Sequence, residues 1–317
     1  MIVKLYKSNI SIAIILTPII AIILCLPILI SDQTAINYNF DWQTHVFGYV
    51  NNSRILDFIL TLFVLIINSV TIVKSFNQTI LFSKTTYLPA IIYLIYISYV
   101  PDLHFSPILI VHFLFLILLN QVLKLNKNKS AIHIAFKSGL IIGLISCFSL
   151  YYSVLIFGLL IPLMLIHLAK PKELILGVLG LSIPLIYLFS IQYIFNGYNI
   201  DFGTTTVKID EQYQLIEYVK ILILMLITIL GVKMVVTFNK QNSLLATKQI
   251  VTITTFSIIS ITLTFILFYN FNLIDYIFIV PFSYIISIGS FSSKNDTFIS
   301  FLLTITLIIN IVSIFLK

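Results

Sequence analysis

The chain alternates long apolar runs with short polar segments along its whole length. A helix that rises about 1.5 Å per residue needs about 20 apolar residues to cross a hydrocarbon core of about 30 Å. Eleven runs approach this length, so the pattern predicts eleven transmembrane helices. Their expected ranges are 10–30, 55–73, 86–100, 106–123, 132–148, 151–168, 174–195, 217–237, 249–268, 273–290 and 298–316.

The pattern defines the division between the fifth and sixth runs least well. Residues 131–169 form one apolar stretch that is too long for one span, and Lys137 is its only charged residue. We expect a turn at residues 149–152, Ser-Leu-Tyr-Tyr, which makes two spans. One span followed by a re-entrant segment is the alternative, and every later loop would then change side of the membrane.

The composition indicates that lipid surrounds most of the molecule. Apolar residues make up 60% of the chain and charged residues only 9%, whereas a soluble domain has about 25% charged residues. The first run follows Lys4 and Lys7, as in a signal peptide, but it is too long for one and no small-residue cleavage site follows it. The lysines are scattered between apolar runs, so the net charge of +7 does not indicate nucleic-acid binding.

The distribution of charge predicts which loops face the cytoplasm. With the N-terminus inside and alternating loops, 14 of the 18 basic residues and two acids fall inside. Four basic and nine acidic residues fall outside. Cytoplasmic loops are enriched in Lys and Arg, so this distribution supports the count of eleven. We therefore predict one all-α transmembrane domain over residues 1–317, in the bacterial cytoplasmic membrane, with the N-terminus cytoplasmic and the C-terminus external.

The centres of the predicted spans are nearly free of ionisable residues. Such residues mark the path of many ion-coupled transporters because they are costly to bury in lipid. His112 lies about two turns into the fourth span, and Asp57 lies at the mouth of the second. We interpret His112 as a hydrogen-bonded packing residue rather than a proton relay.

Small residues in two spans predict close packing between helices. Gly139 and Gly143 form a small-xxx-small pair, and Gly177 and Gly180 can act in the same way in the seventh span. A helix face of this kind lets a neighbouring backbone approach closely.

The chain lacks the motifs of common soluble chemistries: no Walker loop, dinucleotide fingerprint, HExxH, CxxC or GxSxG is present. The first external loop, 31–54, instead combines the only Trp and the only Arg of the chain with Asp41 and His45. A carboxylate can take a proton from a hydroxyl, and Arg can hold a phosphate through two hydrogen bonds. Asp41 is therefore a candidate catalytic base, with Arg54 and His45 as candidate substrate or phosphate ligands. Helix capping by Asp41 and an ion pair between Arg54 and Asp57 are the structural alternatives.

Two further external loops add candidate residues. Residues 99–107, YVPDLHFSP, place Asp102 and His104 in a short connection stiffened by prolines, where a structural turn is the default. Asp102 is a candidate second catalytic carboxylate, and His104 a candidate substrate ligand. The longest external loop, 196–216, carries Lys208 as a candidate phosphate ligand and can cover a site. These residues require no cofactor, and a divalent metal would be compatible with them.

Three stretches carry a family resemblance: KTTYLPAIIYLIYISYVPDLHFSPILI (84–110), AFKSGLIIGLISCFSLYYSVLIFGLLIPLMLI (135–166) and KPKELILGVLGLSIPLIYLFSIQYIF (170–195). They resemble a family of flavobacterial integral membrane proteins of unknown activity. More distantly, they are similar to the membrane core of the GT-C superfamily of glycosyltransferases. That similarity implies a catalytic acid at Asp41, a second acid at Asp102 and a sugar donor carried on polyprenyl phosphate.

The sequence leaves three functions open. In a membrane glycosyltransferase, Asp41 would accept the proton of the acceptor hydroxyl, and Arg54 with Lys208 would stabilise the leaving phosphate. Asp102 and His104 would orient the acceptor or a metal. The second possibility is a non-catalytic scaffold that docks other envelope membrane proteins. The third is a lipid or small-molecule transporter, which would need a continuous polar path.

Overall fold

The computed structural model of the chain describes residues 6, 10–30, 41–79, 85–100, 103–125, 131–167, 169–196, 229, 231–233, 235, 244–271, 276–292, 301 and 303–309. These residues form helices and short connections, with no strand among them. The helices are α2 (Ile10–Ile30), α3 (Asp41–Asn51), α4 (Arg54–Asn77), α5 (Leu88–Ile97), α6 (Pro107–Val122), α7 (Ile132–Ser146), η1 (Leu150–Leu155), α8 (Ile156–Pro162), η2 (Leu163–His167), α9 (Pro171–Asn196), α11 (Leu244–Phe271) and α12 (Ile279–Ser292). The described residues within 229–235 and 301–309 are also helical.

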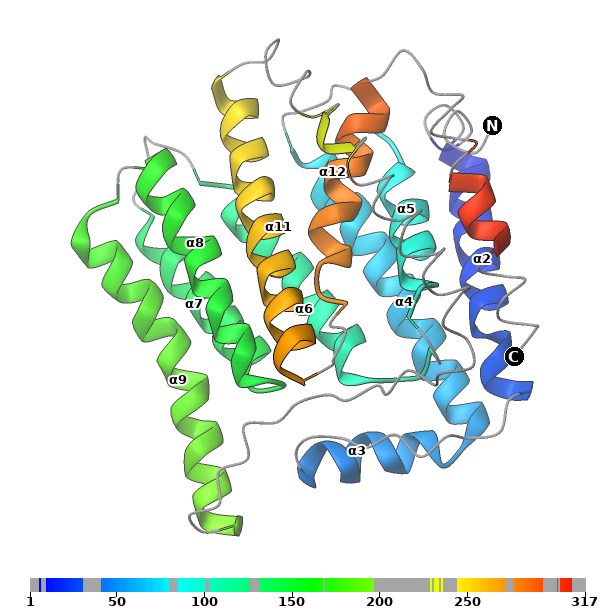
Figure 1. The fold of residues 1–317 in the computed structure, drawn as a ribbon, viewed down its shortest axis with the longest axis horizontal. Helices are drawn as coiled ribbons and strands as arrows, with labels where there is room; N and C mark the ends of the chain where they lie inside the picture. Colours follow the sequence, from blue (N-terminus) through cyan, green and yellow to red (C-terminus); the bar gives the residue numbers. More distant parts are fainter. Residues whose placement is uncertain are drawn as a thin grey trace.

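Most of the helices stand side by side in one bundle, and α3 lies across one end of it (Figure 1). Along the bundle, α2 packs on α4, α4 packs on α5 and α6, and α6 packs on α7. Helix α9 lies at the edge of the bundle, against α7 (Figure 1). We call the end that carries α3 and the connections at residues 103–106 and 147–149 the α3 end.

Four helices are long and apolar enough, by length and composition, to cross a bilayer: Ile12–Ile30, Arg54–Asn77, Pro171–Ile194 and Ala246–Leu267. Large apolar side chains are exposed on each of them, including Ile15, Phe63, Ile194 and Phe265. An apolar surface of this extent is stable against lipid and costly against water. The fold is therefore that of an all-α polytopic membrane protein, as the apolar pattern predicted.

Five apolar helical segments are shorter than a full span: Leu88–Ile97, Pro107–Val122, Ile132–Ser146, Leu150–Ile166 and Ile279–Ser290. Every residue of α5 is buried, and so is every residue of α12 up to Ser290. A helix that is apolar all round belongs in the interior of a bundle. Neighbouring helices rather than lipid surround such a helix, so the backbone beyond its ends does not need to stay helical.

The chain turns between the fifth and sixth runs as expected, but at residues 147–149 rather than 149–152. Helix α7 ends at Ser146, where the amide of Cys147 still donates to the carbonyl of Gly143. The 3-10 helix η1 then begins at Leu150, and α8 runs back beside α7 (Figure 1). Residues 132–167 therefore form a helical hairpin, whereas the crossing of the membrane by both arms stays a prediction.

The segment predicted to be the first external loop contains a helix, α3, which the apolar pattern did not predict. This helix has 11 residues, so it measures about 16 Å at about 1.5 Å per residue and is too short to span a bilayer. Its buried positions Gln43, Phe47 and Val50 recur at helical spacing. A search for runs of about 20 apolar residues does not detect so short an amphipathic helix.

The close helix packing predicted from the glycines is confirmed as the contact between α7 and α9. A Cβ atom added to Gly139 would lie 2.0 Å from the carbonyl oxygen of Gly177. One added to Gly143 would lie 2.6 Å from the oxygen of Leu181, and one added to Gly180 would lie 2.5 Å from that of Phe136. The two backbones therefore touch at a place where no side chain fits between them.

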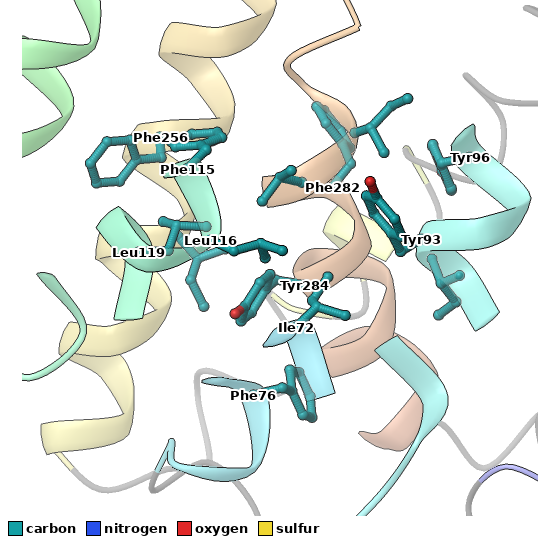
Figure 2. Packing of buried hydrophobic residues seen from close by; sticks show 14 of the residues in the cluster. Ile72, Phe76, Tyr93, Tyr96, Phe115, Leu116, Leu119, Phe256, Phe282 and Tyr284 are labelled. Atoms are coloured by element: carbon teal, nitrogen blue, oxygen red, sulfur yellow. The ribbon is translucent and has the colours of Figure 1, made fainter. Parts of the chain in front are cut away.

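Aromatic side chains fill the interior between α4, α5, α6, α11 and α12, as Figure 2 shows. Phe115 and Phe256 join α6 to α11 with ring centroids 5.6 Å apart. Phe76 and Tyr284 join α4 to α12 with centroids 5.8 Å apart. These offset and edge contacts hold helices that are far apart in the sequence.

Glu173 ties the beginnings of two helices together. Pro171 is the first residue of α9, and Glu173 two residues later donates its amide to the carbonyl of Lys170. In return, Glu173 Oε2 accepts from the amide of Lys170 at 3.0 Å, which is a reciprocal capping arrangement. The other oxygen, Oε1, accepts from the amide of Ala131 at 2.9 Å, immediately before α7. One buried carboxylate thus caps α9 and holds the start of α7 beside it.

We expect Glu173→Ala to lower the free energy of unfolding by about 1–3 kcal/mol, because the substitution removes the acceptor of the buried Ala131 amide and of the partly buried Lys170 amide. Thermal unfolding of the purified protein in detergent measures this as a lower Tm. Lys172→Ala is the control, since Lys172 is the exposed neighbour of Glu173. Equal Tm values for the two variants would contradict the capping role.

Candidate functional site

A carboxylate and an imidazole form a buried pair at the α3 end. Asp57 lies in the first turn of α4, where its amide donates to the carbonyl of Ser53. His104 lies in the connection between α5 and α6, shortly before Pro107 begins α6. Asp57 Oδ2 and His104 Nδ1 are 2.6 Å apart, and both side chains are almost fully buried.

Within the described part of the chain, three donors hold the Asp57 carboxylate. Its second oxygen, Oδ1, accepts from the amide of Phe105 at 2.7 Å and from the hydroxyl of Thr61 at 3.1 Å. Thr61 lies one turn along the same helix, so it reaches Asp57 from the same face. A carboxylate with both oxygens bonded in this way has a fixed orientation.

The pair also fixes the imidazole of His104. An ionised carboxylate only accepts hydrogen bonds, so Nδ1 carries the hydrogen and Nε2 of the neutral ring has a free lone pair. Within the described part of the chain, Asp57 is the one hydrogen-bond partner of His104. A carboxylate that orients an imidazole through Nδ1 leaves Nε2 able to act as a general base.

Helix α3 packs over this end of the bundle. Phe47 contacts Phe105, the residue after His104, with ring centroids 5.4 Å apart. One turn earlier, Gln43 Nε2 donates to the carbonyl of Phe148 at 3.1 Å. Through these two contacts α3 touches the connection that carries His104 and the connection that follows α7.

The predicted site residues are only partly described. Asp41 and His45 belong to α3 and lie two residues to either side of the buried Gln43, which places their backbone positions on the opposite side of the helix by periodicity. Their side chains lie outside the described part of the structure, as do Asp102 and Lys208 altogether. The predicted lid at 196–216 also lies outside the described residues, except for Asn196 at the end of α9.

Two predicted residues lie at or beside the buried pair. His104 is one member of the pair. Arg54 is the first residue of α4, exposed and three residues before Asp57. The structure brings both to the α3 end.

Asp57 is a site residue that the sequence does not predict, since the pattern indicates it only as an ionisable residue at the mouth of a span and as an ion-pair partner of Arg54. Its signal was a carboxylate at the mouth of an apolar helix, with a histidine in the next external connection. The pairing spans 47 residues, so spacing alone could not reveal it.

A second polar group lies deeper in the bundle. Asn68 Nδ2 donates to the hydroxyl of Tyr93 at 3.0 Å, and that hydroxyl lies 3.2 Å from His112 Nδ1. His112 Nε2 donates to the carbonyl of Tyr276 at 3.0 Å, so the neutral ring accepts from Tyr93 at Nδ1. This confirms the interpretation of His112 as a hydrogen-bonded packing residue.

Among the described residues, no group of three or more His, Cys, Asp or Glu side chains is placed to hold a metal ion. The pair of Asp57 and His104 supplies two such groups, and the Nδ1 atom that faces the carboxylate is already used in their hydrogen bond. The described residues thus supply one oriented carboxylate–imidazole pair, an arrangement suited to acid–base chemistry.

No family model, curated protein or solved structure matches the chain. The resemblances to a flavobacterial membrane protein family and to GT-C glycosyltransferases therefore stay predictions, and what the described structure contributes is an all-α membrane fold with an oriented histidine at one end.

Proposed function

We propose that this protein is a glycosyltransferase of the bacterial cytoplasmic membrane that moves a sugar from a polyprenyl phosphate to an acceptor hydroxyl at the outer face. The observation that carries the proposal is the 2.6 Å contact between His104 Nδ1 and Asp57 Oδ2. It supplies an oriented general base at the mouth of an apolar bundle, where a lipid-borne donor can present its headgroup.

In the proposed reaction, His104 Nε2 takes the proton of the acceptor hydroxyl while the hydroxyl oxygen forms a bond to the anomeric carbon of the sugar. The bond from that carbon to the phosphate oxygen breaks, and polyprenyl phosphate leaves with the electron pair. Asp57 stabilises the imidazolium that results. The exposed Arg54 guanidinium balances the charge on the leaving phosphate.

The other predicted residues keep supporting roles in this proposal. Asp41 is the alternative base that the GT-C resemblance implies, and Asp102 and His45 would orient the acceptor. Lys208 would add a second cation near the leaving phosphate.

The proposed topology has eleven spans, a cytoplasmic N-terminus and an external C-terminus, with the α3 end outside. The positions of the lysines support it: Lys74 lies in the last turn of α4 and Lys124 follows α6, both at helix ends away from the buried pair. Lysines near span ends favour the cytoplasmic side.

Single cysteines at described, exposed positions test this orientation. In a protein with Cys25 and Cys147 replaced by Ala, we expect Ser53→Cys to react with a membrane-impermeant maleimide in intact cells. We expect Lys124→Cys to react only after the membrane is opened. The reverse pattern would invert the topology and place the reaction centre in the cytoplasm.

Release of polyprenyl phosphate tests the activity. The purified protein in lipid vesicles would receive radiolabelled polyprenyl-phosphate hexoses or pentoses, with an envelope glycan and lipid extract as acceptor. We expect release by the wild type and a loss of about 10- to 150-fold in Arg54→Gln, because a hydrogen bond to a charged group contributes about 1.5–3 kcal/mol. Lys124→Gln, which removes an exposed cation at the opposite end of α6, should keep full activity.

A non-catalytic scaffold is the second candidate, and one observation favours it. Two hydrogen bonds of Asp57, to His104 and to the amide of Phe105, fasten the connection at residues 103–106 to α4, beside exposed polar residues at Asn52, Ser53 and Arg54. Such a stiff polar corner suits docking of another envelope protein. Failure of the wild type to release polyprenyl phosphate from any of the donors would reject the transferase and leave this candidate.

A transporter is supported less well. Along α4, the buried Leu65 separates Asp57 and Thr61 from Asn68. This apolar interruption is unlike the continuous polar path that transport through the bundle needs.

A further inference from the structure

Helix α3 has two distinct faces. Gln43, Phe47 and Val50 are buried against the bundle at 0%, 1% and 8% exposure. Val46 and Tyr49, three residues apart on a neighbouring row, are 52% and 77% exposed. Trp42 precedes Val46 by four residues, so its backbone position falls on the same row. An apolar and aromatic row therefore remains uncovered on a helix that already packs on the bundle.

The position of α3 restricts what can cover this row. The helix lies across the end of the bundle rather than along it (Figure 1). With 11 residues it cannot span the hydrocarbon core. It can, however, lie in the plane of the membrane surface with one face toward the headgroups.

The uncovered row continues into the apolar surface of a membrane-crossing helix. Helix α4 follows α3 after two residues and is one of the four helices that can cross a bilayer. Its exposed residues near this end are Ile55, Ile59 and Phe63, at 68%, 55% and 59%. These residues lie in the first three turns of α4, next to the end of α3. The headgroup region of a bilayer that surrounds them therefore lies at the level of α3.

We propose that the exposed row of α3 is a lipid-binding surface that lies in the headgroup region of the bilayer. Tyr49 has the side chain for this position, because Tyr and Trp place an apolar ring and a polar group at the membrane–water interface. Val46 adds apolar contact on the same row. The partner is the lipid surface itself, and this inference does not depend on the proposed transferase activity.

Lipid binding on this row has a structural consequence for the buried pair. On the buried face of α3, Phe47 contacts Phe105. The amide of Phe105 donates in turn to Asp57. A bilayer that holds α3 in place therefore also holds the connection that carries His104.

The single Trp of the chain makes a direct test possible. Trp42→Phe combined with Tyr49→Trp leaves one indole, at position 49, which is more exposed than position 46 on the same row. The full-length protein would be reconstituted in phosphatidylcholine vesicles whose acyl chains carry bromine either near the headgroup or near the chain end. Trp42→Phe combined with Ile59→Trp is the matched control on the lipid-facing row of α4.

We expect the Trp at position 49 to lose more emission to the shallow bromines than to the deep ones. Position 59 lies in the second turn of α4, further from the α3 end. Compared with the Trp at position 49, the Trp at position 59 should therefore lose relatively more of its emission to the deep bromines. Quenching of position 49 by aqueous iodide and by neither brominated lipid would overturn the proposal, because the row would then face water. Protection from all three quenchers, with position 59 still quenched by lipid, would also overturn it and indicate that protein covers the row.

Discussion

His104→Asn is expected to reduce sugar transfer by about 100- to 10,000-fold, which is the usual contribution of a general base. The asparagine Nδ2 group can replace Nδ1 of the imidazole as the donor to Asp57, so the carboxylate keeps its partner. The variant loses only the lone pair of Nε2, which is the atom that accepts the proton in the proposed reaction. The fold should therefore persist while the chemistry fails.

Release of radiolabelled polyprenyl phosphate measures this loss, and the Tm in detergent measures the fold. His133→Asn is the matched control, because His133 is an exposed histidine on α7. Full activity in His104→Asn would reject His104 as the base and return that role to Asp41. A large drop in Tm would instead assign the pair a structural role, as the scaffold candidate requires.

Gly139→Ala is expected to force α7 and α9 apart and to lower the free energy of unfolding by about 1–3 kcal/mol or more, the usual cost of overpacking. The new Cβ atom would lie 2.0 Å from the oxygen and 2.9 Å from the carbon of the Gly177 carbonyl. Both are backbone atoms, so no rotamer change relieves the collision. The helices must separate, and the contacts of Gly143 and Gly180 would be lost with that of Gly139.

Gly177→Ala is the matched control on the facing helix. The Cβ atom that it adds meets Leu159 at 3.5 Å, which is an ordinary van der Waals distance. Alanine is also a better helix former than glycine by about 0.8–1 kcal/mol, so this variant should be neutral or slightly more stable. Thermal unfolding of the two variants gives the comparison, and equal destabilisation would show that the crossing does not have this geometry.

The helical parts of the fold could be predicted because lipid imposes a simple requirement. Each span needs a long apolar run, and α2 begins and ends at the predicted residues, 10 and 30. The close-packing role of the glycines in α7 and α9 could also be predicted, since small residues three or four apart lie on one helix face. The pattern could not identify the partner of each face; the structure shows that the glycines of α7 pack against those of α9.

The candidate site was less predictable because its central contact is not local. Loop position indicated His104 and Arg54, but not that Asp57 would bond to His104 across 47 residues. Likewise, the loop pattern at residues 31–54 did not reveal α3, whose short apolar row is meaningful only against the bundle that buries it.

The sequence by itself determined that the chain is helical and lies in a membrane, because only long apolar runs and few charges satisfy hydrocarbon as a solvent. It also determined which helices could approach closely. The tertiary structure decided that Asp57 faces His104, that Glu173 caps α9 and holds the start of α7, and that α3 lies across the bundle. Hydrogen bonds between distant segments depend on where packing places each helix, and hydropathy carries no information about that placement.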